Sequence, residues 1–115
     1  MIFKSQEHKD FFYDRVEKTR DCYYQSFFYV AGLSEDTRNY IEDIFDFNEN
    51  RINPEGLSCS WQTSGTRRIT LMAFNLWNGY AESGCEEEST PYELFADSNA
   101  EFFIEAIRLH FSEYM

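Results

Sequence analysis

The fold class is decided by one stretch in the second half of the chain, Ser64-Gly65-Thr66-Arg67-Arg68-Ile69-Thr70-Leu71-Met72-Ala73-Phe74-Asn75-Leu76-Trp77-Asn78-Gly79. Apolar residues recur in it at the i, i+3, i+4, i+7 spacing of one helix face. That face holds Ile69, Met72, Ala73 and Leu76. Two more rings make the other side apolar as well, which is typical of a helix in the middle of a domain. We expect Ser64 or Thr66 to cap its start and Gly79 to end it.

Upstream lies the most aromatic segment of the chain, residues 22–31, followed by Gly32, which suits a helix end. The part Tyr23–Val30 is also the best candidate for a strand, because aromatic residues and valine favour sheets. No second segment offers itself as the partner strand. We therefore predict a helix.

Two more helices are expected in the first half of the chain. The first is capped by Ser5 and runs to about Arg20. The next begins at Ser34, where two acidic residues follow near the positive end of the helix dipole. Its apolar positions at helical spacing are Tyr40, Ile41, Ile44 and Phe45. We expect residues 48–56 to form a loop in which Pro54 opens a short helical turn.

The last third of the chain begins with a polar, acidic loop over residues 81–89. Thr90 and Ser98 each begin a capping box, with a glutamate three residues further on. The final helix carries one apolar stripe: Ala100, Phe103, Ile104, Ile107 and Phe111. The 115 residues are 43% hydrophobic and 19% aromatic, which is too apolar for a disordered chain. We predict a mostly α, single compact domain over residues 1–115, with five to six short helices around an aromatic-rich core.

Several features point to the cytoplasm. No apolar run reaches the length of about 18 residues that spans a bilayer, and the start of the chain has no long apolar stretch of the secretory kind. Cys22, Cys59 and Cys85 are odd in number and widely spaced, which suits a reducing compartment. We expect a cytoplasmic protein that does not bind a membrane.

The net charge of −11 is unevenly distributed. Between residues 31 and 50, Arg38 stands against six acidic residues, and between residues 81 and 115, Arg108 stands against nine. The centre, residues 51–80, has three arginines and one glutamate. Acidic blocks of this kind repel nucleic acid, so no direct binding to it is expected. They form either a solvated surface or a face that binds a basic partner.

The sequence contains few candidate reactive sites. The run Asp46-x-Asn48-x-Asn50 resembles the front of a calcium loop, but the positions for glycine and the chelating glutamate hold Arg51 and Leu57. We interpret the run as an ordinary polar turn. His8 and His110 have no second ligand at zinc spacing and are read as surface histidines, and the cysteines as small buried residues. The familiar nucleotide-binding and hydrolase motifs are missing, which disfavours an enzyme without ruling one out. We assign no catalytic residue, cofactor or metal.

The greatest variety of side chains occurs in Trp61-Gln62-Thr63-Ser64-Gly65-Thr66-Arg67-Arg68. Ahead of a helix, this loop could hold an anion on backbone N–H groups or form a contact surface rich in Trp and Arg. Alternatively, Trp61 belongs to the core and the polar residues only cap the helix. Arg67 and Arg68 are placed against the helix dipole, a weak hint of another role.

Nearly the whole chain resembles a family of small uncharacterised proteins of Firmicutes, filed as a domain of unknown function. The stretches that carry the resemblance are Phe45-Asp46-Phe47, Pro54-Glu55-Gly56-Leu57, Trp61-Gln62-Thr63-Ser64-Gly65, Ala73-Phe74-Asn75-Leu76-Trp77-Asn78-Gly79-Tyr80 and Ser89-Thr90-Pro91-Tyr92-Glu93-Leu94-Phe95. Such proteins are often carried on conjugative elements, plasmids and phages. The resemblance implies no activity, but small acidic proteins in that setting are often inhibitors of host defence, anti-CRISPR proteins among them.

The leading hypothesis is therefore a non-enzymatic protein-binding module, an acidic inhibitor of a basic, nucleic-acid-binding host complex such as a CRISPR effector. Its expected contacts are Glu82, Glu86, Glu87, Glu88, Glu93 and Asp97, with Trp61, Arg67 and Arg68 as a second surface. Two alternatives stay open. One is a small accessory enzyme or anion-binding protein that uses a pocket at residues 61–68, and the other is a structural homodimer.

Overall fold

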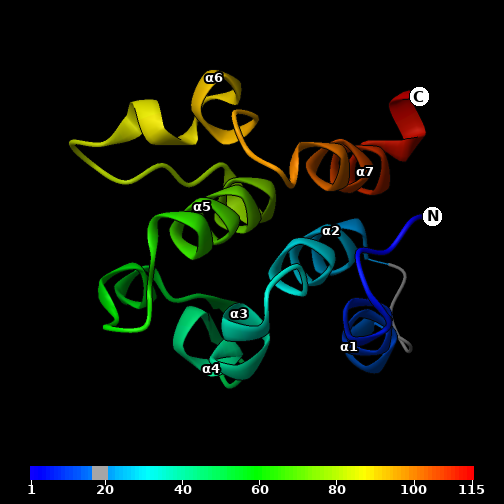
Figure 1. The fold of residues 1–115 in the computed structure, drawn as a ribbon, viewed down its shortest axis with the longest axis horizontal. Helices are drawn as coiled ribbons and strands as arrows, with labels where there is room; N and C mark the ends of the chain where they lie inside the picture. The colour runs from blue at the N-terminus through cyan, green and yellow to red at the C-terminus, as the bar shows by residue number, and fades with distance from the viewer. Residues whose placement is uncertain (17–20) are drawn as a thin grey trace.

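A computed structural model describes residues 1–16 and 21–115 and shows a mostly α-helical domain, as predicted (Figure 1). The radius of gyration, 12.9 Å, is that of one compact domain of this length. The helices and strands in the described residues are α1 (Gln6–Val16), α2 (Cys22–Ala31), α3 (Glu35–Asn39), α4 (Ile41–Ile44), β1 (Phe45–Asp46), β2 (Arg51–Ile52), η1 (Pro54–Ser58), α5 (Ser64–Asn78), η2 (Glu86–Ser89), α6 (Pro91–Leu94), α7 (Ala100–His110) and η3 (Ser112–Tyr114). No helix in them is both long and apolar enough to cross a bilayer.

Helix α2 lies at the centre, against α5 on one side and against α1 and α7 on the other (Figure 1). This explains why its sequence is so aromatic, since it needs large apolar side chains on more than one face. Phe27, Phe28 and Tyr29 have 0%, 1% and 0% of their surface exposed. The prediction of a helix over this segment is confirmed. The predicted central helix, α5, is its main neighbour.

Helix α1 packs on α2 through a close approach at Gly32. A Cβ atom on this glycine would lie 2.9 Å from the side chains of His8 and Phe11, so a larger residue would displace one of these rings. The Oγ of Ser5 accepts a hydrogen bond from the N–H of His8, which confirms the predicted cap. The predicted end of the helix, near Arg20, lies outside the described residues.

The single helix predicted after Ser34 is wrong beyond its first turn. The cap is correct, because the Oγ of Ser34 accepts from the N–H of Thr37. At Tyr40 the backbone leaves the helical region (φ −107°, ψ 29°), and the chain continues as the single turn α4. The ring of Tyr40 is exposed and stacks on Trp61 at a centroid distance of 5.1 Å, so the packing of two aromatic side chains overrides the helical periodicity.

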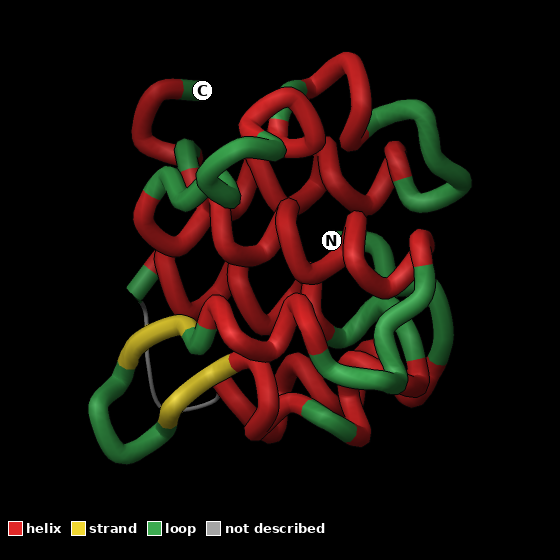
Figure 2. Tube along the Cα trace, turned by 90° about the vertical axis from the view of Figure 1, so that its left-hand side faces the viewer, coloured by secondary structure: helices red, strands yellow, loops and turns green. Residues whose placement is uncertain are grey.

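A two-stranded antiparallel hairpin, β1–β2, was not predicted (Figure 2). Its polar turn is the run that resembles a calcium loop. The Oδ1 of Asp46 accepts hydrogen bonds from the N–H groups of Asn48 and Glu49, and Asn50 has a left-handed φ of 56°. Asn tolerates this region well. The interpretation as a polar turn fits this geometry. Pro54 opens the 3-10 helix η1, as expected.

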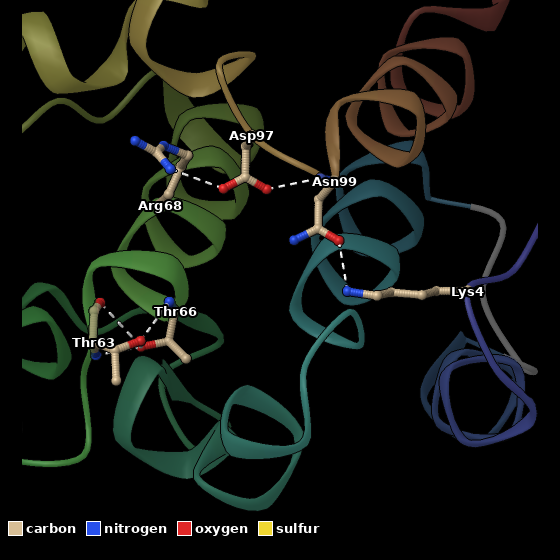
Figure 3. Close-up of polar contacts among 6 residues, drawn as sticks. All are labelled: Lys4, Thr63, Thr66, Arg68, Asp97 and Asn99. Atoms are coloured by element: carbon tan, nitrogen blue, oxygen red, sulfur yellow. Dashed lines mark hydrogen bonds and ion pairs between the residues drawn. The ribbon is translucent and has the colours of Figure 1, made fainter.

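Helix α5 is capped one residue earlier than predicted, at Thr63 (Figure 3). Its Oγ1 accepts from the N–H of Thr66, whose own Oγ1 accepts from the N–H of Thr63. This reciprocal pair is a capping box. Gly79 ends the helix in a left-handed conformation (φ 78°), as predicted.

The two capping boxes predicted at Thr90 and Ser98 do not form. The hydroxyl of Thr90 donates to the carbonyl oxygen of Glu87 instead, and Asn99, which precedes α7, makes no side-chain capping hydrogen bond. The expected apolar stripe of α7 is also displaced. The buried residues are Phe102, Phe103 and Ala106, whereas two members of the stripe, Ile104 and Phe111, remain 45% and 39% exposed.

Candidate functional site

The candidate site is the acidic segment, defined as residues 82–97, together with the two arginines of α5 that hold it. Arg67 lies at the start of the second turn of α5. One nitrogen, Nη2, is 2.7 Å from Oε1 of Glu82 and 3.0 Å from Oε2 of Glu88. The hydrogen bond from Arg67 lowers the pKa of Glu88. One cation therefore joins the two ends of the turn between these glutamates.

Arg68 holds the other end of the segment (Figure 3). Its Nη1 is 2.8 Å from Oδ2 of Asp97, a side chain that is only 10% exposed. Oδ1 of Asp97 accepts from the backbone N–H of Asn99, and Oδ1 of Asn99 accepts from Nζ of Lys4. Desolvation alone would raise the pKa of Asp97, but the hydrogen bonds from Asn99 and Arg68 lower it. The chain of contacts links α5, the start of α7 and the N-terminal segment.

The backbone of the acidic segment is built from short turns. Gly84 has a left-handed φ of 86°, and the N–H of Cys85 donates to the carbonyl oxygen of Glu82. The 3-10 helix η2 follows directly. Glu86 and Glu87, in its first turn, are exposed and make no ion pair within the described part of the chain. Glu93 is half-buried. The exposed carboxylates thus project from a fixed backbone.

The same turn brings together the one group in the described residues with the composition of a metal site, Glu82, Cys85 and Glu88, whose ligand atoms lie within 4.8 Å of one another. Arg67 already occupies both carboxylates. Desolvation and the two carboxylates also raise the pKa of the Cys85 thiol, which disfavours the thiolate that binds metals. Within the described residues, the two carboxylates of this cluster are therefore paired with an arginine.

The residues of the pocket predicted at 61–68 divide between two sides of the structure. Ser64, Arg67 and Arg68 line a small pocket together with Glu88 and Glu93, whereas Trp61 and Gln62 contact other elements. The indole Nε1 of Trp61 donates to Asp43 at 2.9 Å, and the amide of Gln62 donates to the carbonyl oxygen of Gly56 and to the hydroxyl of Thr70. Arg67 and Arg68 turn the other way, towards the acidic segment. Trp61 packs at the α3–α4 side, and both arginines form ion pairs with carboxylates.

The interpretation of His8 as a surface histidine is wrong, since His8 is fully buried. Its Nδ1 accepts from the N–H of Lys4, and its Nε2 lies 2.7 Å from the carbonyl oxygen of Tyr29. Burial lowers its pKa to about 4. His110 is half-buried, with Nδ1 2.9 Å from the hydroxyl of Ser26. The three cysteines are free and half-buried rather than fully buried.

The first acidic block and the acidic segment, which is the first part of the second block, lie on different parts of the fold. The block at 35–49 lies on α3, α4 and the hairpin, at the lower end of the molecule in Figure 1. The acidic segment lies on η2 and α6 at the upper end, beyond α5. These two groups of carboxylates therefore lie at opposite ends of the molecule in this view.

The fold and the site define a small α-helical domain whose distinguishing feature is a charged segment clamped by two arginines. The whole chain, residues 1–115, matches a family of unknown function, DUF6075, and the protein belongs to that family. No curated protein and no solved structure matches the chain.

Proposed function

We propose that the protein is a non-enzymatic binding module that uses the acidic segment to dock on a basic protein surface. The observation that supports this most directly is the use of Arg67 and Arg68. They neutralise Glu82, Glu88 and Asp97, three of the six carboxylates first expected to meet a partner. These three are internal anchors, and the contacts to a partner fall to Glu86 and Glu87, with Glu93 beside them.

The clamp gives the segment a property that a plain acidic loop lacks. A flexible chain of glutamates loses conformational freedom when it binds, which offsets part of the interaction energy. Here the ordering is achieved during folding, by ion pairs from Arg67 and Arg68 and by η2. The exposed pair Glu86 and Glu87 is then presented in one geometry, and the net charge of −11 favours encounters with positive surfaces.

A basic surface that evolved to hold phosphates is the partner this segment suits best, because carboxylates can meet the same Lys and Arg side chains. The resemblance to proteins of Firmicutes mobile elements favours a more specific partner. We propose a host defence complex that binds nucleic acid, such as a CRISPR effector, with the protein acting as its inhibitor. The acidic segment would occupy part of the nucleic-acid groove.

The experiment compares three forms of the full chain as bait in a lysate of a Firmicutes host, followed by binding measurements with the captured protein after purification. The test variant is Glu86→Gln with Glu87→Gln. The matched control is Glu35→Gln with Glu42→Gln, which removes the same charge from exposed positions of the other block. We expect the test variant to weaken binding about tenfold or more at low salt, and the control to bind like the wild type.

Each other result has a defined meaning. Equal weakening by both variants would show that only the net charge matters and would remove the acidic segment as a docking site. Weakening by the control alone would move the site to the block at 35–49. A captured protein that binds equally well in the presence of a nucleic-acid competitor would contradict the inhibitor version, because the two ligands would not share a groove.

A further inference from the structure

A second feature of the molecule is a pocket of about 150 Å³ between α5, α6 and α7. Its walls are mostly apolar and include Leu94 of α6 and Ile107 of α7, with Phe111 beside them. Its polar lining consists of Asn75, Ser89 and His110. The carboxylates and arginines of the candidate site do not line it, although Ser89, Pro91, Leu94 and Phe95 of the acidic segment do. The pocket therefore adjoins the proposed docking surface without using its charged groups.

Ser89 is the polar group in this pocket that lacks a partner. The residue is 8% exposed, and its Oγ makes no hydrogen bond in the described part of the chain. Buried hydroxyls nearly always have a partner, because an unpaired one destabilises the fold. The neighbouring Thr90 shows the usual solution, since its hydroxyl donates to the carbonyl oxygen of Glu87. The hydroxyl of Ser89 is instead left unpaired in the pocket lining.

The polar lining is uncharged. Nδ1 of His110 is 2.9 Å from the hydroxyl of Ser26, which also donates to the carbonyl oxygen of Cys22. Burial lowers the pKa of His110, so the ring is neutral at pH 7. Asn75 and Ser89 carry no charge at any pH of interest. A charged ligand would lose its hydration here without meeting an opposite charge, so a neutral ligand is favoured.

We propose that this pocket binds a small neutral molecule, a single apolar ring that carries a hydroxyl group, with the hydroxyl hydrogen-bonded to Ser89. The volume of the pocket suits one ring, because an apolar cavity of about 150 Å³ accommodates benzene. The chemistry agrees as well, because the serine hydroxyl can both donate to and accept from a ligand hydroxyl. The remaining contacts are the apolar walls, which stabilise the ring in proportion to the area they cover.

The test uses the full chain and two probes of nearly equal shape, phenol and toluene, which differ by a hydroxyl in place of a methyl. Binding is followed by titration in ¹H–¹⁵N NMR spectra, with the amides of Ser89, Leu94 and Ile107 as reporters. We expect phenol to bind about fivefold more tightly than toluene to the wild type, and Ser89→Ala to abolish or reverse this preference. The matched control, Ser83→Ala, removes an exposed hydroxyl from the same segment and should leave the preference unchanged.

Four results would overturn the proposal. They are the absence of shifts at the reporter amides with either probe, shifts only at other residues, an unchanged preference in Ser89→Ala, and tighter binding of N-acetyltyrosinamide than of phenol at the same amides. The last result would assign the pocket to a tyrosine side chain of a partner protein. Ser89→Ala is not expected to unfold the chain, since it removes an unpaired hydroxyl, and a thermal melt without ligand should show an equal or higher Tm. Because the variant leaves Glu86 and Glu87 in place, this proposal and the docking proposal can fail separately.

Discussion

The buried histidine of α1 makes the stability of this fold depend on pH between about 6.5 and 4. His8 is fully enclosed and uses both ring nitrogens as a neutral ring: Nδ1 accepts from the N–H of Lys4, and Nε2–H donates to the carbonyl oxygen of Tyr29. Protonation would place a hydrogen on Nδ1, opposite the N–H of Lys4, and would bury a charge. Desolvation is the main reason that its pKa is lowered to about 4.

The contribution of His8 to the free energy of unfolding follows from its pKa values in the folded and unfolded chain. The usual value of 6.5 applies to the unfolded chain, and about 4 applies to the folded protein. The unfolded chain therefore binds the proton more tightly, so the contribution is fully present above pH 6.5 and is lost as the pH falls towards 4. One unit corresponds to about 1.4 kcal/mol, so the whole loss is about 3 kcal/mol, of which about 2 kcal/mol is gone at pH 5.

The assay is urea unfolding at pH 7 and pH 5 for the wild type and for His8→Gln. Glutamine can keep the hydrogen bond to Tyr29 but has no proton to bind, so the variant should lose about 2 kcal/mol less than the wild type between these two pH values. The lowered pKa values of Asp97 and Glu88 act below this range, and that of His110 acts equally in both proteins. Parallel losses in the two proteins, or an NMR titration of His8 with a midpoint near 6.5, would refute the reasoning.

Three further predictions concern stability. Arg67→Met should lower the free energy of unfolding by about 1 kcal/mol at low salt and by less at high salt, because its ion pairs are partly exposed; a loss that does not depend on salt would contradict this. Gly56→Ala should cost more than about 2 kcal/mol in chemical unfolding, because the new methyl overlaps the carbonyl oxygen of Asp43, whereas Gly65→Ala, which has room in α5, should gain about 0.5–1 kcal/mol. Equal effects at the two glycines would show that packing is not the cause. Asn50→Gly relieves the left-handed backbone of the hairpin turn and should raise the Tm in a thermal melt by about 2 °C, and a lower Tm would count against the turn geometry.

The helices could be predicted from the sequence where a local pattern and a local terminator agree. The caps at Ser5 and Ser34 and the end at Gly79 each depend on residues within one turn, and all three form. The aromatic segment of α2 is harder to predict from local sequence, because its composition also suits a strand. It is a helix because its rings are shared among α1, α5 and α7, a tertiary reason that local propensity does not contain.

The features that the sequence did not predict depend on contacts that the local residue pattern does not show. Thr90 and Ser98 are residue types that form capping boxes, but competing local hydrogen bonds, from Thr90 to Glu87 and from Asn99 to Asp97, form there instead. The burial of His8 requires α2 and the N-terminal segment to close over it, and nothing in the residues around His8 announces that. The orphan hydroxyl of Ser89 is likewise invisible in sequence, since a serine ahead of a helix is ordinarily a surface residue.

For the candidate site, the residue types were visible and the pairing was not. The sequence shows Arg67 and Arg68 placed against the dipole of α5, and it shows an acidic run that begins 15 residues later. Only the structure shows that these are two halves of one feature. The cost of the misplaced charges, a few tenths of a kcal/mol each, is offset by ion pairs that fix the acidic segment.

Because some carboxylates anchor the acidic segment and others are exposed, a functional test has to distinguish the loss of an anchor from the loss of a contact with a partner. Neutralising Glu82, Glu88 or Asp97 removes an anchor, so a loss of binding could reflect a disordered segment rather than a lost contact. Neutralising Glu86 and Glu87 leaves every anchor in place, and a loss of binding then reports the contact itself. If both classes of variant bind a partner equally well, the clamp serves only the stability of the fold, and the functional surface must be sought elsewhere on the domain.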